Sequence, residues 1–196
     1  MAVKKKSAKK VKKAKPKKSE KVFIKIAQEI WPLERDVLFR PDRMKYVRKL
    51  LKPEGCVFCR ANNMEMSLDT LCVFKSKYSM MVLNKFPYNS GHILILPRRH
   101  CGDLLALSIE EYHDLQDTIR LAMKALSEAY RPGGFNLGLN HGSVAGAGIP
   151  EHLHYHLIPR WSGDLNFFPL IAETKVLVES LEQTYEKLCG ILKSYE

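Results

Sequence analysis

The chain has 196 residues and a formal net charge of +11, but this charge is concentrated at one end. Residues 1–18 hold ten of the 32 lysines and arginines and no acidic residue, which leaves 22 basic against 21 acidic side chains in the rest. The remainder is therefore nearly neutral, and no apolar run is long enough to cross a bilayer or to serve as a signal peptide. We expect a cytoplasmic protein with one main domain.

The first part of the chain is predicted to lie outside that domain. Residues 1–20 should form a disordered Lys-rich tail, because they cannot bury enough apolar surface to fold alone. Residues 1–18 would suit nucleic acid or another polyanion, although a solvated tail without a specific partner is an equal alternative. Residues 21–52 are expected to be an N-terminal extension, and residues 53–196 the folded domain with its C-terminal helix.

A Cys-x-x-Cys pair, Cys56 and Cys59, opens the domain. Five cysteines in a chain without a signal peptide argue against a disulfide framework. The pair has the spacing of half a zinc site and needs two further ligands, whereas a redox role requires a thioredoxin-like context that the sequence lacks. The pair alone is moderate evidence for a metal.

The hydropathy pattern after the cysteine pair predicts an α+β domain. Asp103 or Ser108 caps a long helix that ends near Tyr130, before a Pro-Gly-Gly turn. A second amphipathic helix spans about residues 174–194 and would pack on its own domain or on a twin subunit. The predicted strands, of which the first three form an antiparallel meander, are residues 71–75, 78–84, 92–96 and 135–139.

A row of three alternating histidines lies between Glu151 and Arg160. The segment contains, in order, His152, Leu153, His154, Tyr155, His156 and Leu157. In an extended strand a period of two puts the imidazoles on one face and the apolar side chains on the other. We expect this strand to lie between Pro150 and Pro159, since proline is disfavoured inside strands. Such a row can bind zinc, act as a nucleophile on phosphorus, or do both.

The glycine-rich stretch at residues 142–148 directly precedes the histidines. It is too small and too glycine-rich to pack a core. Glycines let backbone N–H groups approach a ligand closely, and successive N–H groups can form an anion-binding concavity. A glycine loop alone is weak evidence, but before three aligned imidazoles it indicates a phosphate seat.

These motifs resemble the histidine triad superfamily. His-Leu-His-Tyr-His-Leu-Ile is similar to its His-x-His-x-His signature followed by two hydrophobic residues, and Gly91 to His100 is similar to its preceding strand. The likeness runs from about Cys56 to Phe168, and residues 159–167 resemble the branch of diadenosine tetraphosphate phosphorylases and dinucleoside polyphosphate hydrolases. The resemblance implies an antiparallel sheet of about five strands, and a homodimer.

The resemblance also assigns roles to residues of this chain. It implies a closed structural zinc site of Cys56, Cys59, His100 and His152, with no catalytic metal, although substrate phosphates can carry magnesium. It implies His154 as the nucleophile and His156 as the proton donor. The nucleotide-binding residues that it implies are Asn84 for the ribose, Asn140, Gly146 and Gly148 for phosphate, and Phe58, Val82 and Leu94 for the base, unless these last three are plain core.

The expected chemistry is therefore a two-step nucleotidyl transfer on a dinucleoside polyphosphate, with water or phosphate as the acceptor. A nucleoside phosphoramidase and a nucleic-acid deadenylase are alternatives within the same superfamily. A zinc-stabilised nucleotide-binding module without enzymatic activity is an alternative of another class.

Overall fold

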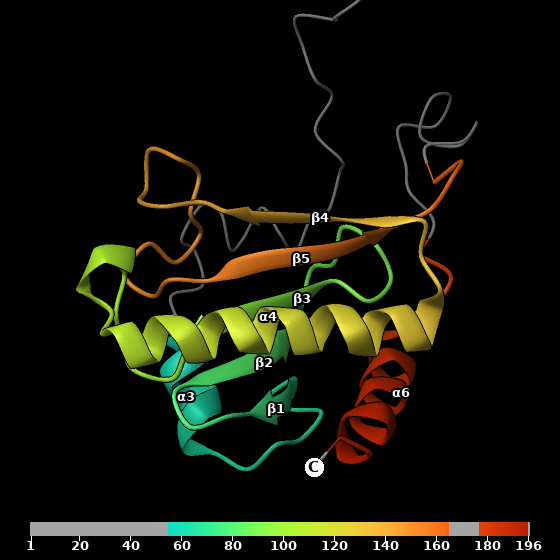
Figure 1. Cartoon of the computed structure of the whole chain (residues 1–196), viewed down its shortest axis with the longest axis horizontal. Helices are drawn as coiled ribbons and strands as arrows, with labels where there is room; N and C mark the ends of the chain where they lie inside the picture. Colours follow the sequence, from blue (N-terminus) through green and yellow to red (C-terminus); the bar gives the residue numbers. More distant parts are fainter. Residues whose placement is uncertain (1–54, 165–176, 196) are drawn as a thin grey trace, which may run out of the picture. The chain divides into compact units, whose positions relative to one another are not determined.

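The computed structural model describes residues 55–164 and 177–195, so the predicted tail at 1–20 and extension at 21–52 lie outside the described residues. One antiparallel sheet of five strands has the order β1-β2-β3-β5-β4 (Figure 1). The α+β prediction is confirmed. The strands are β1 (Cys72–Lys75), β2 (Ser79–Leu83), β3 (Ile93–Pro97), β4 (Gly134–Leu139) and β5 (Tyr155–Arg160). The helices are α3 (Val57–Asn63), the 3-10 turn η1 (Leu104–Ala106), α4 (Ile109–Tyr130) and α6 (Leu181–Lys193).

The long helix α4 is defined by local signals at both ends. The Ser108 side chain accepts from the Glu111 N–H while the Glu111 carboxylate accepts from the Ser108 N–H, which completes a capping box. Asp103, the other cap that the sequence suggested, instead caps η1. The helix ends where Arg131 takes a left-handed conformation with φ of 44°.

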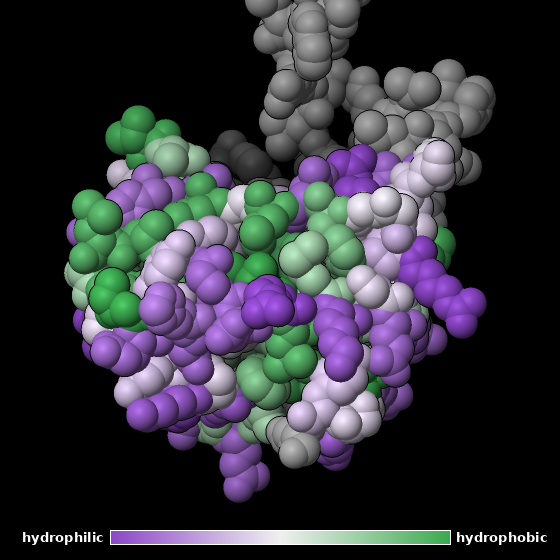
Figure 2. Space-filling model, in the orientation of Figure 1, coloured by the Kyte–Doolittle hydropathy of each residue, from purple (hydrophilic) through white to green (hydrophobic). Residues whose placement is uncertain are grey.

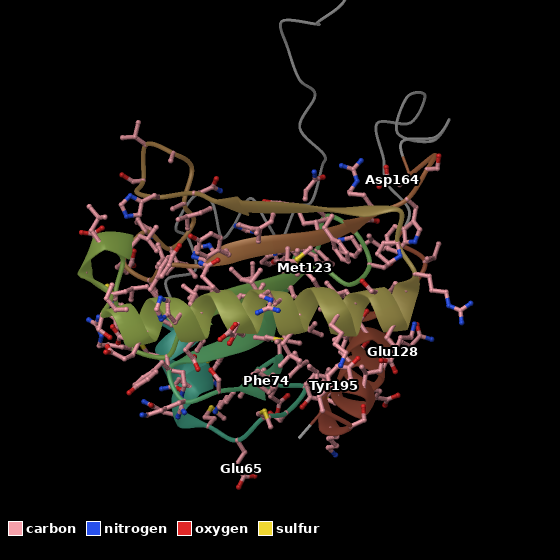
Figure 3. All side chains as sticks on the ribbon, in the orientation of Figure 1. Glu65, Phe74, Met123, Glu128, Asp164 and Tyr195 are labelled. Carbon is pink, nitrogen blue, oxygen red and sulfur yellow. The ribbon has the colours of Figure 1, made fainter. Side chains whose placement is uncertain are left out.

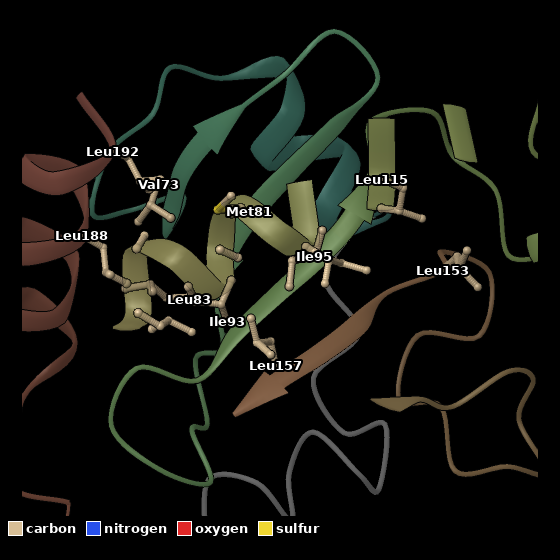
Figure 4. Close-up of a cluster of buried hydrophobic side chains, with 14 residues drawn as sticks. Val73, Met81, Leu83, Ile93, Ile95, Leu115, Leu153, Leu157, Leu188 and Leu192 are labelled. Carbon is tan, nitrogen blue, oxygen red and sulfur yellow. The ribbon is translucent and has the colours of Figure 1, made fainter. Parts of the chain in front are cut away.

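Strand alternation divides the apolar residues between the two faces of the sheet. On the face covered by α4 and α6, a core forms from Met81 and Leu83 of β2, Ile93 and Ile95 of β3, and Leu157 of β5 (Figure 4). A second cluster on the opposite face joins α3 to the alternate positions of the same strands. Its buried members are Phe58, Ala61, Cys72, Met80, Val82, Leu94 and Leu96.

Helix α6 packs on its own domain, beside α4 and β1. Its buried residues Leu188 and Leu192 belong to the same core as the α4 side chains. Near the end of the chain, the Tyr195 hydroxyl donates to the Glu128 carboxylate of α4, and Figure 3 shows the two labelled side chains together. The predicted start near residue 174 lies outside the described residues, and residues 177–180 are not helical.

The outer surface of the α4 layer is polar. Figure 2 shows hydrophilic side chains crossing the front of the domain, with apolar patches between them. No helix among the described residues is long and apolar enough to span a membrane.

The histidine-bearing strand has different bounds from those predicted. β5 begins at Tyr155, so His152 and His154 lie in the extended segment before it, and Pro159 lies inside it. The Pro159 carbonyl accepts from Asn89 Nδ2 at 3.0 Å. The N and C=O of one residue in an antiparallel strand point to the same side, so the Pro159 nitrogen points to the side of Asn89, away from β4. On that side, β3 pairs with β5 only as far as Leu157. The proline therefore removes no ladder hydrogen bond.

Candidate functional site

The alternation predicted for the histidines holds across the segment. Leu153 and Leu157 enter the core under α4, and the His156 position pairs with Leu94, which faces α3. His154 follows on the same face, with its ring 5.3 Å from Phe58 and 5.2 Å from His156, between centroids. The imidazoles thus share the face of the sheet opposite α4.

His154 is held in one tautomer. Its Nδ1 lies 2.8 Å from the His152 carbonyl oxygen, which can only accept, so Nδ1 carries the proton and Nε2 keeps its lone pair. The side chain is only 6% exposed, and this burial lowers its pKa below the usual 6.5. An uncharged imidazole with an unprotonated Nε2 is the form that can attack an electrophile.

His156 is held in the opposite tautomer by a short relay. The Tyr88 N–H donates to His92 Nδ1 at 3.1 Å, which leaves the His92 proton on Nε2. That Nε2–H donates to His156 Nδ1 at 3.0 Å, so a neutral His156 carries its proton on Nε2. The two neighbouring imidazoles therefore present complementary nitrogens, an acceptor on His154 and a donor on His156.

The predicted metal ligands converge from three segments of the chain. One ligand atom from each of Cys56, Cys59, His100 and His152 lies within 4.8 Å of every other. Cys56 Sγ is 3.3 Å from His152 Nδ1, and Cys59 Sγ is 3.2 Å from His100 Nδ1. The four residues could bind a metal ion.

The chemistry of this cluster fits a tetrahedral zinc site. His152 Nε2 donates to the Pro97 carbonyl oxygen at 2.8 Å, which leaves Nδ1 unprotonated and aimed at the two sulfurs. Two thiolates and two imidazoles close the coordination sphere, as in structural zinc sites. The cysteines are placed by α3, a helix that the sequence analysis did not predict.

The three proposed base contacts lie together. Phe58, Val82 and Leu94 are 5–6% exposed and belong to one cluster, with Phe58 touching His154 through its ring. Asn84, the predicted ribose ligand, stands at the end of β2, where its Oδ1 accepts from the Phe86 N–H and its Nδ2 contacts His92. The cluster forms an apolar floor beside the nucleophile candidate.

The predicted phosphate loop is exposed. Asn140, Gly146 and Gly148 are all exposed, and Gly146 adopts φ of 88°, a conformation that favours glycine. The Gly146 N–H donates to the Ser143 carbonyl within the loop at 3.1 Å, so this donor is engaged in the described conformation.

Gly102 holds the segment that carries the triad, a role that sequence reasoning missed. A Cβ there would lie 2.5 Å from the Pro150 carbonyl oxygen and 3.1 Å from backbone atoms of Glu151. The Leu153 N–H donates to the Cys101 carbonyl at 2.7 Å, directly beside this contact. A lone glycine between Cys101 and Asp103 gives no sequence signal of such a close approach.

Comparison with known proteins gives a single family. A model described as HIT domain matches residues 65–163. The AP-4-A phosphorylase of Mycobacterium tuberculosis is 40% identical over 114 residues, which are 58% of this chain and 58% of that protein. The asymmetrical bis(5'-nucleosyl)-tetraphosphatase of Schizosaccharomyces pombe is 30% identical over 118 residues, 60% of this chain and 61% of its own length. The matches thus span about three fifths of each relative.

Solved structures agree on the fold. A hypothetical histidine triad nucleotide-binding protein of Sulfolobus tokodaii is 25% identical, with a TM-score of 0.57, and covers 71% of this chain and 93% of its own. A Zn-bound histidine triad family protein of Mycobacterium smegmatis is 24% identical, also with a TM-score of 0.57, over 72% of this chain and 98% of its own.

Proposed function

We propose, from the premise that this chain belongs to the HIT domain family, that it cleaves dinucleoside polyphosphates by nucleotidyl transfer through His154. The observation that carries the proposal is the pair of complementary imidazole nitrogens on neighbouring side chains. The AP-4-A phosphorylase and tetraphosphatase names of the two relatives support this substrate class.

In the first step, His154 Nε2 attacks the α-phosphorus of one nucleotide. An N–P bond forms as the bridging P–O bond breaks, and the His156 Nε2–H donates a hydrogen bond to the departing oxygen, which leaves as an anionic polyphosphate. With diadenosine tetraphosphate the products are ATP and an AMP group carried on His154. Asn140 and the N–H groups of the glycine loop, among them Gly148, would hold the phosphate oxygens as charge builds.

In the second step, an acceptor attacks the carried phosphorus and His154 leaves with its electron pair. His156 Nδ1 stays hydrogen-bonded to His92, so the His156 Nε2–H can again donate to an oxygen of the carried phosphoryl group as charge builds. An attacking water gives its proton to solvent. Water releases AMP, and inorganic phosphate releases ADP. No step requires a catalytic metal, although magnesium can accompany the substrate phosphates.

The nucleotide would lie on the apolar cluster of Phe58, Val82 and Leu94, with Asn84 near the ribose. Zinc held by the four-ligand cluster would supply structural stabilisation, because two thiolates and two imidazoles leave no open position for substrate. The four-ligand cluster would link α3, which carries Phe58, to the segment that carries His154.

We further propose that the protein is a homodimer paired through β4. β4 is an edge of the sheet, and its Asn136, Leu137 and Gly138 are exposed, Leu137 to 47%. An edge strand with an exposed apolar side chain is a ready template for pairing with a second chain. Residues 1–18 remain a proposed contact for nucleic acid or another polyanion.

Product analysis on diadenosine tetraphosphate, with and without inorganic phosphate, tests the function. ADP plus ATP formed only with phosphate identifies a phosphorylase, and AMP plus ATP without phosphate identifies a hydrolase. His154→Ala should abolish either activity while the protein stays folded by circular dichroism. Absence of cleavage by the native chain would refute the substrate class and direct the assay to phosphoramidates and adenylated DNA.

A further inference from the structure

A basic cleft that no triad histidine lines is formed by residues of α3, the β1–β2 turn, the segment after β3 and the start of α4. Figure 1 shows these elements at the same end of the sheet. Four separate segments supply its walls, and the described side chains that line it are almost all charged or polar. They are Asn62, Lys77, Tyr78, Arg98, Arg99 and Glu111. Three of these side chains are cationic and one is anionic, so the lining carries a net positive charge.

The acidic groups near the cleft are already committed. Glu111 pairs with Arg99 through two contacts of 2.7 and 2.8 Å, and this pairing lowers its pKa to about 2. Asp114 accepts from the Ser76 hydroxyl at 2.6 Å and from the Tyr78 N–H at 3.2 Å. The Glu111 carboxylate therefore neutralises Arg99, and the Asp114 carboxylate stabilises the β1–β2 turn.

Arg98 and Lys77 supply the uncompensated charge. Arg98 is half-buried, and its guanidinium hydrogen bonds to other described residues all go to neutral acceptors, Asn62 Oδ1 at 2.8 Å and the Ser76 carbonyl at 3.0 Å. Within residues 55–164 and 177–195, no carboxylate lies within ion-pair distance of Arg98 or Lys77. Burying part of a cation without an opposite charge is costly, so an arrangement of this kind favours an anionic ligand.

We propose that this cleft binds a phosphate group of a small phosphate-bearing anion. The two neutral contacts fix the plane of the Arg98 guanidinium through Nε and Nη1, which leaves Nη2 with no hydrogen bond to another described residue. An arginine fork held in advance loses little entropy on binding phosphate oxygens. Lys77, whose Nζ lies 4.7 Å from the Tyr78 ring, adds a mobile point charge at the mouth.

The site is tested by titrating the full chain with inorganic tripolyphosphate and following two nuclear magnetic resonance signals, the Arg98 Nε–H and the Tyr78 backbone N–H. Both should shift saturably, because the Arg98 Nε–H is held by Asn62 beside the cleft. Arg98→Gln should weaken binding about tenfold, read from the Tyr78 signal, since a charge-assisted contact is lost. Lys77→Gln should weaken it about two- to fivefold, as for an exposed charge pair.

Arg120→Gln is the matched control, because Arg120 is an exposed arginine of α4 outside the cleft and should leave the titration unchanged. Lys77 is exposed and its loss should not disturb folding, so the proposal stays testable if Arg98→Gln unfolds. Shifts confined to the triad and the glycine loop, or equal affinity in Lys77→Gln and native protein, would overturn it. Tighter binding of single-stranded DNA without a terminal phosphate would assign the cleft to a nucleic-acid backbone instead.

Discussion

Replacing Gly102 by alanine should displace the segment that carries His152 and His154, although Gly102 itself lies outside the candidate active site. The added Cβ would lie 2.5 Å from the Pro150 carbonyl oxygen and 3.1 Å from two backbone atoms of Glu151. These are main-chain atoms, so no side chain can rotate away to make room. The segment that leads into His152 and His154 must move instead.

The structure indicates the size of this effect. Forcing an extra carbon into a packed interior typically costs about 1–3 kcal/mol. For a chain of this length, a loss of about 2 kcal/mol corresponds to a fall in Tm of roughly 4–8 °C. Turnover and metal content should fall further than stability does, because the displaced segment carries both His154 and the proposed metal ligand His152.

Gly134→Ala is the control, since a Cβ at Gly134 meets nothing within 4 Å. Thermal unfolding, metal content by elemental analysis and cleavage of diadenosine tetraphosphate would be measured on both variants and the native chain. If Gly102→Ala matched Gly134→Ala in all three measurements, the close approach of the two backbones would not be what positions the triad segment.

Three further predictions concern the four-ligand cluster, the Arg99–Glu111 pair and the edge strand β4. Cys59→Ser should lower metal content and Tm together, and a chelator should reproduce that fall in the native chain but not in the variant. Arg99 lowers the pKa of Glu111 from 4.5 to about 2, so the pair stabilises the folded state above pH 4.5 and this contribution is lost as pH falls toward 2. The difference in Tm between native and Glu111→Gln protein should therefore shrink over that interval. A constant difference would contradict the assignment. Leu137→Lys should convert the proposed dimer to a monomer in sedimentation experiments, and an unchanged mass would exclude pairing through β4.

The sequence was informative where a regular period carried the signal. The alternation of imidazoles with Leu153 and Leu157 predicted which side chains face the core, and the structure confirms it. Ser108, one of the two caps that the sequence suggested, does begin α4, where Glu111 completes a capping box between near neighbours. The four residues proposed as metal ligands do lie together, as the resemblance rather than the spacing implied.

The sequence was uninformative where backbones distant in the chain meet. The predicted strand limit at Pro159 was wrong, because the placement of a proline depends on which neighbouring strand faces its nitrogen. The relay through His92 and the close approach at Gly102 join segments separated by more than 40 residues. No local pattern encodes either contact.

The segment before β5 and β5 itself together carry the three histidines and complete the core, with alternate side chains serving the two purposes. A shift of one residue in the pairing of β5 would exchange the side chains of its two faces, so no register error leaves the interior intact while it turns His156 away from the other imidazoles. Any activity of the three histidines should therefore be lost together with the register of β5.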